Sequence, residues 1–106
     1  MTVSSNLSQD NNELVISVSG KFDFTQVKSF RDAYTSNLDS SNDTSDDMQY
    51  VVDLQETEHM DSSALGMLLN MRKHLGDSVK ISITNTRPQI KKILTISRFD
   101  KKFSVQ

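Results

Sequence analysis

The spacing of hydrophobic residues predicts a hairpin at the start of the chain, followed by alternating strands and helices. One segment alternates apolar and polar residues at Leu14, Ile16 and Val18, which is the period of a strand. Residues 9–12 are a turn by composition, so the weaker segment 3–7 is expected to pair with this strand. Three further strands are expected at residues 48–54, 79–83 and 103–105.

Three helices are predicted between these strands, because apolar residues recur there every three or four positions. The first begins near Thr25, the second follows Asp61 and ends at Gly76, and the third opens at Pro88, which suits a first helical turn. Their expected apolar faces are Val27, Phe30, Tyr34 and Leu38 in the first, Leu65, Leu68, Leu69, Arg72 and Leu75 in the second, and Ile90, Ile93 and Leu94 in the third.

The expected order of elements is therefore β-β-α-β-α-β-α-β. Strand–helix alternation implies parallel neighbours, and the initial hairpin implies antiparallel pairing at one edge. We expect an α/β fold, in which a mixed β-sheet with an N-terminal hairpin carries packed helices. A length of 106 residues suits one domain, so we expect a single domain over residues 1–106.

Composition narrows the class of protein without changing this fold. The chain has no cysteine, which excludes disulfides and thiolate chemistry and fits a reducing compartment. Its first residues lack the basic start and the apolar run of a secretory signal. No run of about 18 apolar residues occurs. We therefore expect a cytoplasmic protein without a membrane partner.

Charge is unevenly distributed along the chain, although the net charge is only −2. Residues 39–61 contain eight acids and no lysine or arginine, whereas residues 87–102 contain six bases and one acid. This asymmetry is typical either of two solvated surfaces or of a surface that steers a protein partner. The basic segment lacks interleaved stacking aromatic residues, so we expect no direct contact with nucleic acid.

Enzymatic and metal sites find little support in the sequence. The three glycines are isolated and form no phosphate-binding loop. A hydrolase triad of Ser62, His74 and Asp53 would lack the G-x-S-x-G elbow. The two histidines show no metal-ligand spacing, and the acidic stretch 39–47 lacks the central glycine and closing glutamate of a calcium loop. We expect no catalysis, no metal and no cofactor.

Asp53 raises the alternative of an aspartyl-phosphate receiver, because it ends a buried apolar strand. Such a site also needs a pair of magnesium-binding acids after the first strand, and the strand ending at Ser19 supplies none. The stability of the phosphate in acid would distinguish this alternative, since phosphoserine survives acid far better than an acyl phosphate.

Asp61, Ser62 and Ser63 come directly before an apolar helical run. Side-chain oxygens of Asp and Ser accept hydrogen bonds from the free amides of a first helical turn, so the three residues are typical of a helix cap. Their surroundings carry more information, because Val51-Val52-Asp53-Leu54 and a polar connection precede Met60-Asp61-Ser62-Ser63-Ala64-Leu65-Gly66. With this arrangement the sequence resembles the STAS domain, and more narrowly the bacterial anti-sigma factor antagonists.

The resemblance extends along nearly the whole chain. Gly20-Lys21-Phe22-Asp23 stands where the family has a Gly-x-hydrophobic-Asp turn after its second strand. Residues 93–103 resemble the family's closing helix and last strand. Arg98 departs from the pattern, since many members have glycine there.

The resemblance implies a function for Ser62. In the family, the first serine of the pair is phosphorylated by an anti-sigma factor that is itself a serine kinase, and a PP2C-type phosphatase reverses the modification. The unmodified form binds the kinase and frees a sigma factor, whereas the phosphorylated form does not bind. Carried over, Ser62 is the phosphorylation site, and Asp23, Asp61 and Ser63 lie at the partner interface. Some relatives act on other outputs, such as biofilm formation, through the same logic.

Met67 and Met71 fall off the predicted apolar stripe of the second helix. They are expected to add a contact patch to this interface, because methionine adapts to different partners. A different class of function stays open, namely a STAS module that binds a nucleotide or another small molecule near Asp23 and Ser62. Saturable nucleotide binding would favour that alternative, whereas capture of a kinase would favour the phosphorylation switch.

Overall fold

The computed structural model describes residues 2–8, 13–39, 49–76 and 79–106. The predicted turn at 9–12 and most of the predicted acidic loop lie outside these residues. The elements are β1 (Thr2–Ser8), β2 (Glu13–Phe22), η1 (Phe24–Gln26), α1 (Val27–Asp39), β3 (Gln49–Asp53), β4 (Thr57–Met60), α2 (Ser62–Leu75), β5 (Lys80–Thr84), α3 (Pro88–Ile96), η2 (Phe99–Lys101) and β6 (Ser104–Val105), where η marks a 3-10 helix.

The strands form one mixed sheet in the order β1-β2-β3-β5-β6, with β4 paired to β2 off this path. β1 is antiparallel to β2, and every other pairing is parallel. The predicted α/β fold is therefore confirmed, including the antiparallel edge and the parallel neighbours. Parallel strands require a crossover between them, and the helices supply it.

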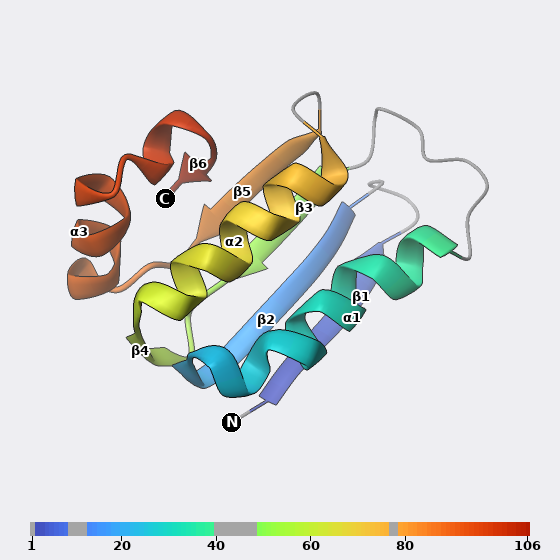
Figure 1. Ribbon diagram of the computed structural model, residues 1–106, viewed down its shortest axis with the longest axis horizontal. Coiled ribbons are helices and arrows are strands. Elements are labelled where there is room, and N and C mark those ends of the chain that lie inside the picture. The colour runs from blue at the N-terminus through green and yellow to red at the C-terminus, as the bar shows by residue number, and fades with distance from the viewer. Residues whose placement is uncertain (1, 9–12, 40–48, 77–78) are drawn as a thin grey trace.

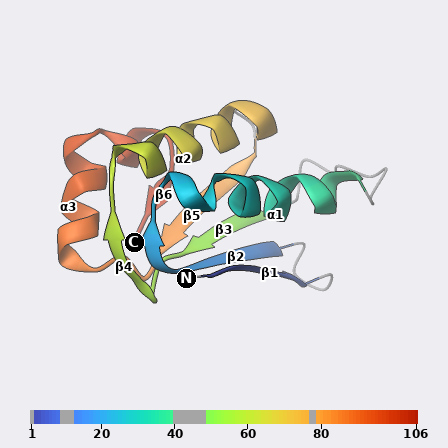
Figure 2. The same ribbon diagram turned by 60° about the horizontal axis from the view of Figure 1, so that its bottom comes forward.

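Helices α1 and α2 lie side by side across one face of the sheet, while α3 stands at its end (Figures 1 and 2). The core forms where these two helices meet the sheet. It contains Leu14, Ile16 and Val18 from β2, Phe30 and Tyr34 from α1, Tyr50 and Val52 from β3, Ile81 and Ile83 from β5, and Ala64, Leu68 and Met71 from α2. The alternation along β2 and the three-four spacing along α1 thus bury the residues that their periods select.

Strand β4 replaces the connection of mostly polar residues that the sequence predicted before Asp61. Thr57 and Met60 are buried, whereas Glu58 and His59 between them are exposed. Thr57 is tolerated in the core because its hydroxyl donates to the backbone carbonyl of Val18 at 2.7 Å. A four-residue strand with a buried threonine carries too little apolar periodicity to be recognised in the sequence.

Gly20 was expected to end the second strand, yet β2 continues to Phe22. Gly20 has a φ of 82°, a conformation that suits glycine, and the register between β2 and β4 shifts between Gly20 and Lys21. Glycine therefore marks a bulge inside the strand. Beyond this bulge β2 pairs with β4, and Phe22 lies opposite Met60.

The apolar face predicted for the second helix is rotated relative to the one observed. Ala64, Met67, Leu68 and Met71 are the buried residues of α2, while Leu69 is 39% exposed. The contact patch predicted from the two methionines is wrong for Met71, which is fully buried, and Met67 is only 6% exposed. Leucines spaced compatibly with a helix suggested the wrong stripe, because a small alanine and two flexible methionines fit against the sheet instead.

Arg72 joins the end of α2 to the C-terminal segment. Its guanidinium donates to the carbonyls of Gly76 at 3.0 Å and Val79 at 2.6 Å through Nη1, and to Lys102 at 2.6 Å through Nη2. The same group lies over the ring of Phe103, 5.2 Å from its centre. Helix α2 ends at Gly76, as predicted, with a φ of 96°.

We expect Thr57→Val to lower the free energy of unfolding by about 1–2 kcal/mol, because it removes the buried hydrogen bond to Val18 at nearly constant volume. Urea denaturation measures the change. Thr57→Ser is the matched control, since it keeps the hydroxyl and should retain the hydrogen bond. Equal effects of removing a methyl group and removing the hydroxyl would contradict this role of the hydroxyl.

Arg98 occupies the left-handed region, with φ 63° and ψ 29°. A side chain costs roughly 1 kcal/mol or more in this conformation, whereas glycine adopts it readily. We therefore expect Arg98→Gly to raise the free energy of unfolding by about 1 kcal/mol. The neighbouring Ser97 has a φ of −81°, so Ser97→Gly should bring no such gain. A stabilisation shared by both glycine variants would refute the explanation.

Candidate functional site

Two aspartates lie next to each other where β2 and β4 end. Phe22 and Met60 are paired in the parallel register, so the residues that follow them, Asp23 and Asp61, leave the sheet at the same edge. Each aspartate is the N-cap of the helical segment that begins immediately after it. The starts of η1–α1 and of α2 are consequently neighbours, near β4 (Figure 1).

Asp61 holds the first turn of α2. Its Oδ1 accepts hydrogen bonds from the backbone amides of Ser63 at 3.0 Å and Ala64 at 3.2 Å, and from the hydroxyl of Ser63 at 2.5 Å. These contacts confirm the capping geometry expected of an Asp-Ser-Ser segment. The hydroxyl of Ser63 is thereby engaged inside the cap.

Asp23 makes the same arrangement at the neighbouring helix start. Its Oδ1 accepts hydrogen bonds from the backbone amide of Thr25 at 3.0 Å and from the hydroxyl of Thr25 at 2.5 Å. Asp23-Phe24-Thr25 and Asp61-Ser62-Ser63 are thus two copies of one local structure, each an aspartate bonded to a hydroxyl residue two positions later. In both copies the middle residue is exposed to solvent.

Ser62 is the middle residue of the second copy and the first residue of α2. Its side chain is exposed, and its hydroxyl makes no hydrogen bond within the described part of the chain. Ser63 is half-buried and bonded to Asp61. The two serines therefore differ in availability, and Ser62 is the one that a modifying enzyme or a partner can reach.

The carboxylate of Asp61 is stabilised in its charged form. The hydrogen bond from the Ser63 hydroxyl is the main reason that the pKa of Asp61 lies below its usual value. The amides of Ala64 and Ser63 and the charge of His59 act in the same direction, whereas burial opposes them. Asp61 is therefore a fixed negative charge beside Ser62 at neutral pH.

Two exposed apolar residues near this site were not recognised in the sequence. Phe24 is the middle residue of the first cap and is 70% exposed. Val27, which was predicted to belong to the buried face of the first helix, is 48% exposed. Phe24 precedes the stripe formed by Phe30 and Tyr34, the residues of α1 that are buried. Val27 shares the spacing of that stripe, so nothing in the sequence signals its exposure.

The other residues considered for chemistry lie elsewhere. His74 is near the opposite end of α2 from Ser62, about 18 Å away along the helix axis, so a hydrolase triad is not assembled. Asp53 accepts hydrogen bonds from the amide of Gln55 at 3.0 Å and from the side chain of Asn85 at 3.1 Å. It therefore fixes the turn after β3 to the turn after β5.

Solved structures with this arrangement of strands and helices include anti-sigma factor antagonists. SpoIIAA in its unphosphorylated form aligns with a TM-score of 0.71 at 16% identity, covering 99% of this chain and 87% of the other. An anti-sigma factor antagonist from Mycobacterium paratuberculosis aligns with a TM-score of 0.76 at 20% identity, over 98% and 85% of the two chains. The fold is thus the SpoIIAA-like α/β fold.

The family follows from the sequence comparisons. The family described as "Mlab, STAS domain" matches residues 5–105. A STAS-domain containing protein of Pseudomonas aeruginosa (strain UCBPP-PA14) is 41% identical over 106 residues, which is 99% of this chain and 99% of the relative. The chain belongs to the STAS domain family, as the sequence resemblance predicted.

We expect Asp61→Asn to reduce stability most at neutral pH. A carboxyl group with a lowered pKa in the folded state contributes stability above its unfolded value, about 3.9, and this contribution is lost as the pH falls through the folded value. The difference in free energy of unfolding between the parent and Asp61→Asn should therefore shrink between pH 6 and pH 3. In a Ser63→Ala background this difference should be smaller at every pH in that range, because the main hydrogen bond to the carboxylate is gone. A pH-independent difference would contradict the lowered pKa of Asp61.

Proposed function

We propose that this protein is a phosphorylation-switched regulator of the anti-sigma factor antagonist type, with Ser62 as the acceptor. The observation that carries the proposal is the difference between the two serines of the cap. The hydroxyl of Ser62 lies at an exposed helix start and makes no hydrogen bond to any described residue, whereas the hydroxyl of Ser63 is bonded to Asp61. The likeness to SpoIIAA, for which both an unphosphorylated and a phosphorylated form are known, supports the same assignment.

A phosphate at this position is compatible with the fold and unfavourable for a bound partner. Phosphorylation adds about −1.5 to −2 charges, and the start of a helix favours negative charge through its free amides and its dipole. The modification therefore requires little rearrangement of α2. A partner surface fitted against the unmodified cap meets added bulk and a second negative group beside Asp61.

The energies involved are sufficient for a local switch. A hundredfold loss of affinity corresponds to about 2.7 kcal/mol. Juxtaposing like charges at an interface costs several kcal/mol. Blocking at the helix start is enough, and no change of the global conformation is required.

The partners in this proposal are a serine kinase that acts as an anti-sigma factor and a PP2C-type phosphatase. The unphosphorylated protein binds the kinase through Asp23, Asp61, Ser62 and Ser63, and the phosphorylated protein releases it. The chain acts in the cytoplasm by protein–protein contact, without catalysis of its own. In the described part of the chain, no helix has the length and apolarity to cross a membrane.

We expect Ser62→Ala to bind the kinase constitutively and Ser62→Asp to bind it at least about a hundredfold more weakly, because the aspartate imitates part of the phosphate charge. Fragment mass spectrometry of the protein from its native cells, with and without phosphatase, should place one phosphatase-sensitive phosphate on Ser62. The Ser62→Ala protein then serves as bait, and the captured kinase is titrated against each variant.

Ser63→Ala is the matched control for this assignment. It should still be phosphorylated at position 62, because the acceptor hydroxyl is untouched. Phosphate on Ser63 with Ser62 unmodified would overturn the proposal. A phosphate that is lost in acid would point instead to Asp53, since acyl phosphates are acid-labile. Saturable nucleotide binding with no phosphate under several growth conditions would favour the small-molecule alternative.

A further inference from the structure

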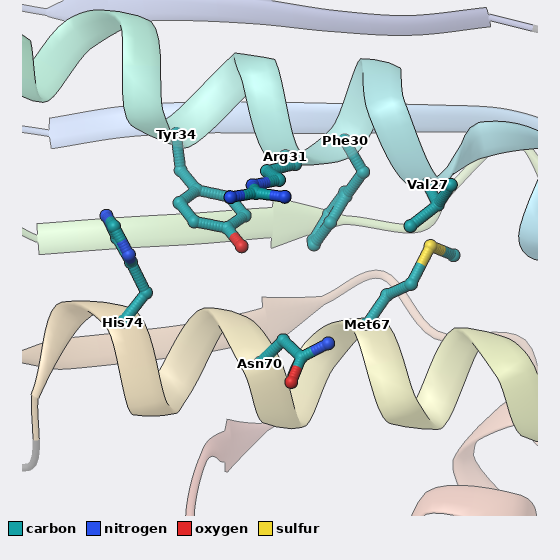
Figure 3. A pocket seen from close by; sticks show the side chains of 7 residues that line it. All are labelled: Val27, Phe30, Arg31, Tyr34, Met67, Asn70 and His74. Atoms are coloured by element: carbon teal, nitrogen blue, oxygen red, sulfur yellow. The ribbon is translucent and has the colours of Figure 1, made fainter.

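A groove runs between α1 and α2 on the face of the molecule turned away from the sheet. Its volume is about 270 Å³, and it is lined by Val27, Phe30, Arg31, Tyr34, Met67, Asn70 and His74. Val27, Phe30 and Met67 give one end an apolar character, while the other end is polar (Figure 3). The groove does not belong to the pair of helix caps, yet it begins close to both, at Val27 on α1 and at Met67 on α2.

The polar end of the groove brings together side chains whose polar atoms make no hydrogen bond to any described residue. Tyr34 is only 3% exposed, yet its hydroxyl points into the groove (Figure 3). This hydroxyl makes no hydrogen bond within the described residues. Arg31 and Asn70 also line this groove, and within the described residues neither side chain makes a hydrogen bond or ion pair. His74 packs against the ring of Tyr34, with 5.6 Å between ring centres.

These groups have in common that they donate hydrogen bonds. A guanidinium, a side-chain amide, a phenol and an imidazole can all donate hydrogen bonds, and the guanidinium matches a carboxylate with two parallel bonds. No acidic side chain lines the groove. An anion the size of a carboxylate therefore satisfies the hydroxyl of Tyr34 and the charge of Arg31 together.

The groove is continuous with the surface around Ser62. Ser62, Gly66, Asn70 and His74 are four residues apart in sequence, so they form a single row along α2, and all four are exposed. Asn70 lies about 12 Å from Ser62 along the helix, well within the span of a standard protein interface. A partner that covers Ser62 and extends along α2 meets the groove next.

Packing within the fold does not explain why position 66, in the middle of this row, is a glycine. A Cβ atom added there would meet nothing within 4 Å, and alanine is favoured over glycine inside a helix by about 1 kcal/mol. A helix surface without a side chain allows the backbone of another chain to approach closely. Glycine between the caps and the groove is therefore consistent with a partner that lies across this part of α2.

We propose that the groove between α1 and α2 is a second anchor point for the protein partner and receives an acidic side chain of that partner, next to an apolar residue held by Val27 and Met67. The identity of the partner as the kinase rests on the proposed function, but the chemistry of the groove does not. A protein side chain is favoured over a free metabolite because the groove is open to the surface and Val27, which lines its apolar end, is itself 48% exposed.

The first experiment tests the groove without a partner. The isotope-labelled full chain is titrated with N-acetyl-glutamate amide and, separately, with N-acetyl-glutamine amide, and amide NMR shifts are followed. We expect saturable shifts, in roughly the millimolar range, at Arg31, Tyr34, Asn70 and His74 with the glutamate probe only. Tyr34→Phe should weaken them and Arg31→Gln should abolish them. Equal shifts with both probes, or none with either, would overturn the proposal whatever the fate of Ser62.

The second experiment uses the kinase captured with the Ser62→Ala bait. Arg31→Glu should lower its affinity about tenfold or more, because a like charge then faces the partner's acidic residue. Lys28→Glu is the matched control, since Lys28 is exposed on the same helix but does not line this groove, so its effect should be markedly smaller. Gly66→Leu should also weaken binding while the monomer stays folded. Equal effects of the two charge reversals would refute the groove as an anchor and leave the role of Ser62 intact.

Discussion

The short parallel pairing between the end of β2 and β4 is the contact on which the candidate site depends. It is held by the hydrogen bond from the amide of Gly20 to the carbonyl of Glu56, at 3.0 Å, and by the buried hydroxyl of Thr57 on Val18. Because Phe22 and Met60 are in register, both chains leave the sheet together. The two aspartate caps, the starts of the two helices and the groove between those helices all take their relative positions from this pairing.

The caps show how one local structure serves both stability and recognition. An aspartate bonded to the hydroxyl two positions later fixes a helix start, and it also forces the residue between them to the surface. In one cap that residue is Ser62, and in the other it is Phe24. The same backbone geometry thus exposes a hydroxyl in one cap and an aromatic ring in the other, and neither belongs to the hydrophobic core.

Sequence reasoning succeeded where periodicity or a specific local motif was strong. The alternation in β2, the spacing of Phe30 and Tyr34, and the ends of helices at Gly76 and Pro88 were correctly interpreted because each reports a local physical requirement. The cap at Asp61 was recognised for the same reason. The family could be identified because the Asp-Ser-Ser segment stood in the expected order of elements.

Features that depend on tertiary contacts could not be obtained in this way. Strand β4 is defined by its partner β2 and by a hydrogen bond that joins residues 39 positions apart. The rotation of α2 about its axis depends on which side chains fit the sheet, so Met71 was placed on the wrong face. The proximity of Asp23 to Asp61 and the shape of the groove arise from that same packing, which no window of neighbouring residues contains.

The position of Ser62 inside a folded helix start has a consequence for enzyme specificity. Many modifying enzymes read a short extended peptide, and the order of residues around the acceptor then defines the substrate. Under the proposed function, the acceptor Ser62 is instead presented on a folded surface assembled from two distant parts of the chain. An enzyme that acts on the folded protein must therefore recognise a shape, and the few residues flanking Ser62 in sequence are not by themselves its substrate.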